Sequence, residues 1–373
     1  MLKLDVLADT LAGLRPVRAQ QRRCLPAVSP QSPCSACQSI CPEGAIALTP
    51  GPIMAECSGC GLCTAVCPSD ALTLDSQSDH ELLQQISTVT RRSRAVSVGC
   101  RPDASVQVGC PGRMPAELLL AAVATGAERV EVVCPDSSCL TCRYAAGQSL
   151  AAQAVRTATD ILTALGRSET VTLVDRPTPP TQVRANRAVH EPLHQDRRDF
   201  LLAAFGLLRQ SVPTVIPGSR PATPDQPDAT ARSPRRDLLL WACECLKPPE
   251  HSSVRWPGSR PHLATFCSQC GVCQQLCPGR VLSLGDTGLA LLPRRCMGCG
   301  LCVKVCPAGA LAMEPGGELA DLLQTAPVPL GRSETLTCHH CGEAFAATVP
   351  TDPTAPTCLT CHIRNSRGED WLT

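Results

Sequence analysis

The pattern of apolar and polar positions predicts a sheet domain in the middle of the chain. Between residues 95 and 174, short apolar runs alternate with longer segments of helical period. This alternation is typical of a small parallel sheet with crossover helices, because strand, helix and parallel strand form the repeating unit of such domains. The predicted strands lie at 95–99, 106–108, 130–134 and 171–174, and the predicted helices at 115–125 and 144–165.

Shorter apolar runs on both sides of this domain form an internal repeat. Each run closely follows a Cys-Pro pair and predicts a short strand. Copies of one arrangement in register indicate two α+β units of the same architecture. The runs are residues 45–48, 71–74, 281–284 and 310–313.

Two further segments have other patterns. Apolar positions from Leu4 to Leu14 recur at helical period and predict an N-terminal helix. Residues 176–236 are rich in proline and polar residues and read as a linker. Within it, the apolar run 200–208 follows a twin-arginine-like Arg197-Arg198 pair; its place far from the start favours an amphipathic docking helix over an export signal.

Composition indicates that metal centres hold much of the chain together. The 373 residues include 27 cysteines and 35 prolines but only three tryptophans, one tyrosine and four phenylalanines. Small cysteine-rich domains bury too little apolar surface to fold unaided. An odd cysteine number without an N-terminal export signal favours metal binding in a reducing compartment, with the cytoplasm as the expectation.

Charge and hydropathy exclude two classes of partner. The net charge is +1, which implies no general attraction to nucleic acid or anionic lipid. Because no run of about 18 apolar residues occurs, we expect no membrane span.

The cysteines repeat one spacing, C-x2-C-x2-C-x3-C-P. Three thiolates on one tight loop can hold three corners of an iron-sulfur cube, and the fourth cysteine, on the departing segment, serves the other cube. The alternatives are zinc sites, which need pairs of C-x2-C, and disulfides, which need an oxidising compartment. Two sets follow: set C is Cys267, Cys270, Cys273 and Cys306, and set D is Cys296, Cys299, Cys302 and Cys277.

The same spacing occurs earlier with one departure. Gln31 stands where the first cysteine of the first motif belongs, and a proline-rich loop could bring Cys24 to that corner. The alternative is a three-iron cluster with Cys24 idle. The two sets are set A, Cys24, Cys34, Cys37 and Cys67, and set B, Cys57, Cys60, Cys63 and Cys41.

Both stretches resemble the bacterial two-cluster ferredoxins. The resemblance implies four 4Fe-4S clusters, and it implies small hairpin sheets on each side of the clusters.

Five cysteines lie near the strand ends of the middle domain: Cys100, Cys110, Cys134, Cys139 and Cys142. The sequence around them, including Cys110-Pro111-Gly112-Arg113-Met114, is similar to that of the delta iron-sulfur subunit of methyl-viologen-reducing hydrogenases. The resemblance implies electron transfer between a hydrogenase and a heterodisulfide reductase. It also implies a 2Fe-2S cluster on Cys110, Cys134, Cys139 and Cys142, the middle set, with Cys100 as a substitute ligand. The alternative is a domain whose thiols are buried without metal.

The C-terminal segment carries two further pairs of cysteines. Their spacing predicts a zinc ribbon in which an intervening hairpin closes the tetrahedron, and a rubredoxin-type iron site is the alternative. The tail set is Cys338, Cys341, Cys358 and Cys361. Cys243 and Cys245 stay unassigned, because one intervening residue makes a poor chelate.

The expected fold class is α+β, with two ferredoxin-like domains around a small α/β parallel-sheet domain and a zinc-ribbon-like module after them. The expected domains are an N-terminal helix at 1–23, a first ferredoxin domain at 24–78, a delta-subunit-like domain at 90–175, a linker with a short helix at 176–236, a second ferredoxin domain at 237–315 and the tail at 330–373.

These features predict an electron-transfer protein that relays single electrons to or from a redox enzyme subunit, a dehydrogenase, hydrogenase or reductase. We find no Gly-rich nucleotide loop and no nucleophile with a base, so we expect no catalytic site of its own. The alternative function is an accessory or maturation factor for a cytoplasmic redox enzyme. A nucleic-acid-binding regulator is disfavoured, because residues 337–362 contain no Lys or Arg.

Overall fold

The computed structural model describes residues 16–48, 53–54, 57–134, 139–168, 170–175, 233–247, 256, 258–350 and 356–366. Contacts divide the chain into two units, of which one comprises 1–177 with 231–373 and the other 178–230. The second unit lies outside the described residues, as do the helix expected at 200–208 and residues 1–15 of the expected N-terminal helix.

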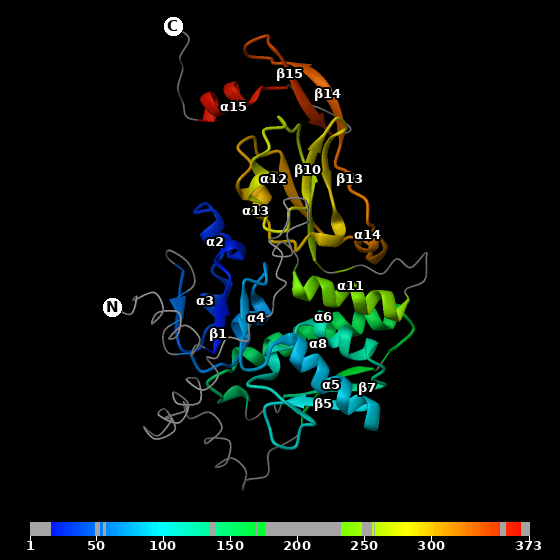
Figure 1. Ribbon diagram of the computed structural model, residues 1–373. Helices are drawn as coiled ribbons and strands as arrows, with labels where there is room; N and C mark the ends of the chain where they lie inside the picture. The colour runs from blue at the N-terminus through cyan, green and yellow to red at the C-terminus, as the bar shows by residue number, and fades with distance from the viewer. Residues whose placement is uncertain are drawn as a thin grey trace, which may run out of the picture. The chain divides into compact units, whose positions relative to one another are not determined.

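A parallel four-stranded sheet forms the middle domain, as the apolar pattern predicts (Figure 1). Helices α6 (Ala116–Ala124) and α8 (Ala146–Ala164) connect its strands at the predicted places. Its strand order is β6-β5-β7-β8, with β5 at Ala95–Gly99, β6 at Val106–Gln107, β7 at Arg129–Val133 and β8 at Val171–Val174. The largest apolar core of the described residues surrounds this sheet.

Two helices beside this sheet were not expected. Helix α5 (Asp79–Ser93) begins at a capping box in which Ser78 and Glu81 satisfy each other's backbone amides. Helix α11 (Pro234–Leu246) begins at Ser233, whose hydroxyl accepts from the Arg236 amide, and it packs on α6. Cys243 of α11 is therefore a core residue of the sheet domain, and burial raises the pKa of its thiol to about 12.

The first ferredoxin unit has two small antiparallel sheets. Strand β1 (Val17–Ala19) pairs with β4 (Leu72–Leu74), and β2 (Ile46–Ala47) pairs with β3 (Ile53–Met54). Residues 17–19 are thus a strand, which corrects the helix expected over 1–23: the partner strand lies 55 or so residues away along the chain. The unit's short helices are η1 (Gln21–Arg23), α2 (Leu25–Val28), α3 (Ala36–Ile40) and α4 (Leu62–Val66).

The second ferredoxin unit repeats this arrangement. Strand β9 (Ser259–Leu263) pairs with β12 (Leu311–Pro315), and the second sheet has the order β10-β11-β13. All four apolar runs that follow a Cys-Pro pair contain a strand, as predicted. The remaining elements are β10 (Leu282–Gly285), β11 (Gly288–Leu291), β13 (Val328–Pro329), α12 (Val272–Leu276), η4 (Pro293–Arg295), α13 (Leu301–Lys304) and α14 (Leu319–Leu323).

The tail is a hairpin followed by a helix. Strands β14 (Arg332–Thr337) and β15 (Ala344–Val349) pair in register, and helix α15 spans Leu359–Ser366. Cys338 and Cys341 lie in the turn between the two strands. The hairpin therefore straddles the first cysteine pair, whereas the sequence interpretation placed it between the two pairs.

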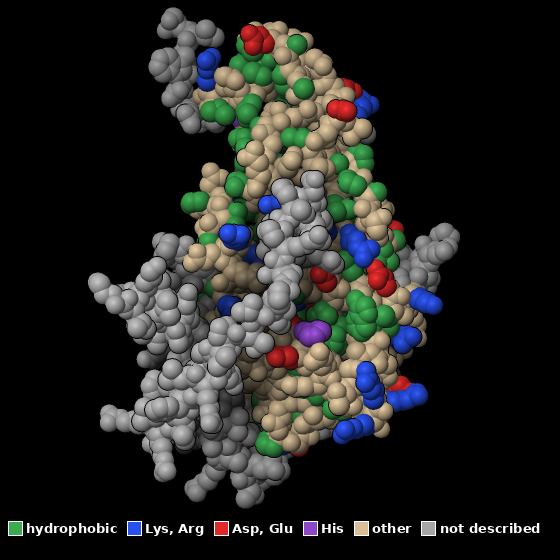
Figure 2. Space-filling view, in the orientation of Figure 1, with side chains coloured by type: hydrophobic (Ala, Val, Ile, Leu, Met, Phe, Trp, Pro, Cys, Tyr) green, Lys and Arg blue, Asp and Glu red, His purple; other side chains and the backbone are tan. Residues whose placement is uncertain are grey.

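The surface carries both signs of charge. Figure 2 shows acidic and basic side chains interspersed over the visible face, in line with a net charge of +1. Among the residues that the structure describes, no helix combines the length and the apolar character that a membrane span needs.

Candidate metal centres

A left-handed turn after each Cys-Pro pair directs a backbone amide at the cysteine sulfur. The third residue after each of these cysteines has a φ of 48° to 60°, and it is glycine in two copies, Asp70 in one and Arg280 in another. The next residue then donates its amide to the thiol, which lowers the electron density on a ligand sulfur. The four N···Sγ distances are 3.4 Å for Ala45 to Cys41, 3.2 Å for Ala71 to Cys67, 3.5 Å for Val281 to Cys277 and 3.3 Å for Ala310 to Cys306.

A left-handed glycine begins the short helix in three of the four motifs. Gly61, Gly271 and Gly300 have φ values of 71° to 79°, which a residue with a Cβ rarely adopts. Each lies between the second and third cysteines of its motif. The equivalent residue of the first motif, Ser35, has a φ of −131°. The first motif thus departs from the others in its backbone as well as in its missing cysteine.

The structure brings each predicted set of four thiols together. Sets A, B and D each line a cavity of their own, with three cysteines from one motif and one from the other. In set C, Cys267 and Cys273 interact electrostatically with Cys270 and Cys306. Cys24 lines the cavity of set A, whereas Gln31 is exposed at the surface.

The protonation chemistry of these thiols fits a cationic iron core. Burial, and then the neighbouring cysteines of the set, raise the pKa of Cys37 to about 11 and of Cys273 to about 12. The same two causes raise the pKa of Cys63 and of Cys302 well above the ordinary thiol value. Four thiolates without metal would repel one another in such a cavity, and bound iron offsets that repulsion. The donor set therefore fits a 4Fe-4S cluster.

The middle domain gathers all five of its cysteines near the ends of its strands. The Sγ atoms of Cys134 and Cys139 are 3.3 Å apart. Burial and the nearby Cys139 and Cys142 raise the pKa of Cys100 to about 11. Burial also raises the pKa of Cys110, which interacts with Cys100 and Cys139, to about 12. Cys100 is therefore close enough to the middle set to serve as the substitute ligand.

The middle set lies beside set B. Cys60 of set B shares an apolar cluster with Cys110, Leu62 and Tyr144. Glycine makes the approach possible, since a Cβ on Gly109 would lie 3.1 Å from the Gly59 carbonyl oxygen and 3.2 Å from the Cys60 Cα. The ion pair between Arg143 and Glu43 joins the same two regions.

The four thiols of the tail set lie close enough together to bind one metal ion. One Sγ from each of its four cysteines lies within 4.8 Å of the other three. Burial alone would raise the pKa of Cys338, but backbone amides of Cys358, Cys341 and His340 lower it to about 6. The hydrogen bond with Cys358, and then burial, raise the pKa of Cys361 to about 12. The set thus contains one thiol that ionises readily, which suits a metal ligand. Thr348 of β15 exchanges two backbone hydrogen bonds with Cys267, so the tail lies against set C.

Comparison with known families agrees with these centres. Residues 266–310 match the family model for a 4Fe-4S dicluster domain, and residues 52–73 match that for a 4Fe-4S binding domain. Residues 99–189 match the model for the methyl-viologen-reducing hydrogenase, delta subunit. The chain carries iron-sulfur electron-transfer domains. Both family resemblances inferred from sequence are thereby confirmed. Neither the curated proteins nor the solved structures contain a match.

Proposed function

We propose that the protein relays single electrons through four 4Fe-4S clusters held by sets A, B, C and D, to or from a partner redox enzyme. The observation that carries the proposal is the crosswise make-up of the cavities: each takes three thiols from one loop and one from the other. That arrangement is typical of two-cluster ferredoxins, which carry two cubes side by side. Each bound cluster would accept and release one electron at a time.

The neighbours of each set suggest a linear order. The middle set lies beside set B, Cys37 of set A interacts with Cys63 of set B, and Cys273 of set C interacts with Cys302 of set D. Between sets A and D, an apolar cluster around Leu25 and Leu301 includes Cys34 and Cys299. The proposed relay therefore runs from the middle set through B, A and D to C.

The middle domain is proposed to hold a 2Fe-2S cluster and to face a hydrogenase-type partner. Support comes from the five gathered cysteines and from the family match over residues 99–189. The tail set is proposed to bind zinc in a ribbon-like module, since four thiols whose sulfur atoms lie within 4.8 Å of one another are the kind of donor set that zinc prefers in structural sites. Iron in the tail is the competing assignment.

Metal and sulfide analysis of anaerobically reconstituted protein tests the proposal. We expect about sixteen irons per chain with equal acid-labile sulfide, and about eighteen of each if the middle set is filled. The tail predicts one zinc per chain, and an extra iron without sulfide would indicate the rubredoxin-type site instead. Dithionite should then produce electron paramagnetic resonance signals from reduced clusters. A colourless preparation with no such signal would contradict the relay.

A further inference from the structure

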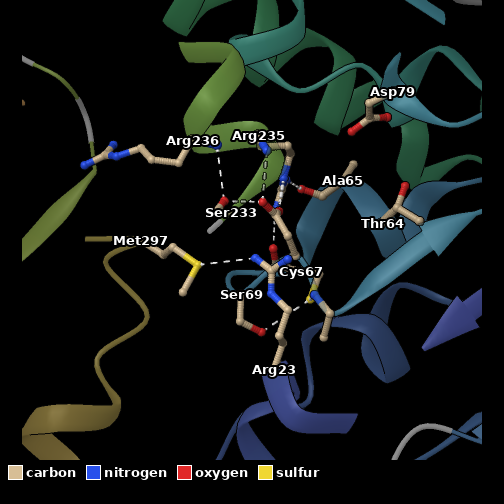
Figure 3. A network of polar contacts seen from close by, with 12 residues as sticks. Arg23, Thr64, Ala65, Cys67, Ser69, Asp79, Ser233, Arg235, Arg236 and Met297 are labelled. Carbon is tan, nitrogen blue, oxygen red and sulfur yellow. Dashed lines mark hydrogen bonds and ion pairs between the residues drawn. The ribbon is translucent and has the colours of Figure 1, made fainter. Parts of the chain in front are cut away.

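The contact between the two ferredoxin units carries three arginines. Figure 3 shows Arg23 directed at Met297 and Arg235 beside Ala65 and Cys67, whereas the Arg236 side chain extends away from this group. Arg23 ends η1 directly before Cys24 of set A. Arg235 and Arg236 begin α11, which packs on the middle domain. Set A and set D thus face each other across a strip of guanidinium groups.

Arg235 is neutralised within this strip. Its guanidinium pairs with Asp70 and also donates to the carbonyls of Ala65 and Cys67. The Ser233 hydroxyl donates to the same carboxylate. Because the Asp70 carboxylate offsets its charge, Arg235 mainly holds α11 against the first ferredoxin unit.

Arg236 extends from α11 to the second ferredoxin unit. Its guanidinium donates to the carbonyls of Arg294 and Pro293, at 3.2 and 3.1 Å, rather than to a carboxylate. It lines one cavity together with Cys67 of set A and another together with Cys296 of set D. The guanidinium itself interacts electrostatically with Cys296 of set D.

Arg23 supplies a second charge at the same contact. Its side chain is 4% exposed, and its guanidinium donates to the Met297 sulfur across the contact, at 4.0 Å. It interacts electrostatically with Cys67. Three carboxylates face these arginines. Asp70 pairs with Arg235 and also interacts with Arg23, Asp237 interacts with Arg23, and Glu117 interacts with Arg235 and Arg236. Burial raises the pKa of Glu117.

Set B has a different environment. The carboxylate of Glu43 lies near Cys57, but it forms an ion pair with Arg143, which also interacts with Cys60, so the two charges at this side of the first ferredoxin unit offset each other. Addition of an electron makes a thiolate-bound cluster more negative, so a nearby cation favours the reduced state and a nearby anion disfavours it. The two environments should therefore separate the potentials of sets A and B.

We propose that Arg23 and Arg236 raise the reduction potentials of the clusters on sets A and D above that of set B, so that electrons collect at the contact between the ferredoxin units. The inference rests on the proposed function and adds the residues that order the relay. An electron leaving set B oxidises that site by one electron and reduces set A by one. The arginines do not exchange electrons. They shift the equilibrium of that transfer toward the contact.

Potentiometric titration of the full chain, followed by electron paramagnetic resonance, tests this inference. In Arg23→Gln and Arg236→Gln, two of the four cluster signals should move to lower potential. The reduced-to-oxidised ratio at fixed solution potential should fall about tenfold for each charge removed, from Coulomb energies at an effective dielectric of about 20. Arg236→Lys, which keeps the charge, should restore most of the ratio.

Two further variants distinguish an electrostatic effect on the reduction potential from a structural one. Arg18→Gln removes an equal charge from an exposed ion pair of the first unit and should change the ratio less than twofold. In Arg23→Gln combined with Met297→Lys, a cation returns from the other side of the contact and the ratio should recover. The inference is overturned if the contact variants shift no more than Arg18→Gln. The proposed function fails separately, if unaltered protein lacks iron or reducible signals.

Discussion

The two ferredoxin units share one cysteine spacing but differ in what surrounds it. The first unit packs through glycines and the Arg143–Glu43 pair against the middle domain, and its first motif lacks one regular cysteine. The second unit has eight regular cysteines and packs against the tail through Thr348. Local spacing therefore brings the thiols of each unit together, while the neighbouring domains decide which sets of thiols lie side by side.

The largest expected effect concerns Cys24, the cysteine of set A that lies outside the regular spacing. Cys24→Ser should remove one iron and leave a three-iron cluster, visible as a new signal in the oxidised protein. Cys267→Ser, the corresponding change in the second ferredoxin unit, should likewise remove one iron from set C.

Adding Gln31→Cys to Cys24→Ser sharpens that test. Gln31 is exposed and lies outside the cavity lining, so the added thiol should not restore the lost iron. Full iron content in Cys24→Ser alone would instead favour the assignment in which Cys24 is idle.

The turn after each Cys-Pro pair allows a matched comparison of stability. Asp70 and Arg280 hold the same left-handed turn position in the two units, but Asp70 is buried against Arg235 and Arg280 is exposed. Asp70→Asn keeps a residue that tolerates the turn and leaves the Arg235 charge without its carboxylate, so it should cost about 3 kcal/mol of unfolding free energy.

Arg280→Asn is the control for that measurement. The same asparagine at the exposed turn should change the unfolding free energy by less than about 0.5 kcal/mol. Equal midpoints of the two variants in anaerobic guanidinium denaturation would contradict the role given to the Asp70–Arg235 pair.

A glycine at the contact between the middle domain and set B gives a smaller effect. A Cβ on Gly147 would overlap the Cys110 sulfur and lie 3.2 Å from Leu62 of the first ferredoxin unit. Gly147→Ala should therefore destabilise the protein by about 1–3 kcal/mol and perturb the optical spectrum of the middle site. Gly285→Ala in the second unit meets no atom within 4 Å and serves as the control. A melting temperature equal to that of the control would show that the contact is looser than described.

The smallest effect concerns helix α5, which connects the first unit to the sheet domain. Ser78→Ala removes the hydroxyl that accepts a hydrogen bond from the Glu81 backbone amide, 3.3 Å away. The change should lower the free energy of unfolding by about 1 kcal/mol. Because the cap is exposed and distant in sequence from the thiols, iron content should not change. Thermal unfolding measured beside iron analysis would separate these two outcomes, and a loss of iron would contradict the expectation.

The elements predicted well are those whose information is local. The strands at 95–99 and 171–174 agree residue by residue with β5 and β8, because valine, which occurs twice in each, favours strand conformation. Helix α5 was missed although Ser78 and Glu81 form a capping-box signature that reading the sequence could have found. Residues 17–19 were missed because their strand pairs with residues 72–74, far along the chain.

The cysteine spacing by itself determined which thiols could meet, since loop geometry over a few residues fixes three corners of each site and one departing cysteine supplies the fourth. Tertiary structure alone decided which sites are neighbours. Arg235 and Asp70 are 165 residues apart in the chain, and no local pattern connects them. The placement of Arg23 and Arg236 between sets A and D likewise depends on the packing of α11, because electrostatic environment is a property of what surrounds a site and not of the motif that builds it.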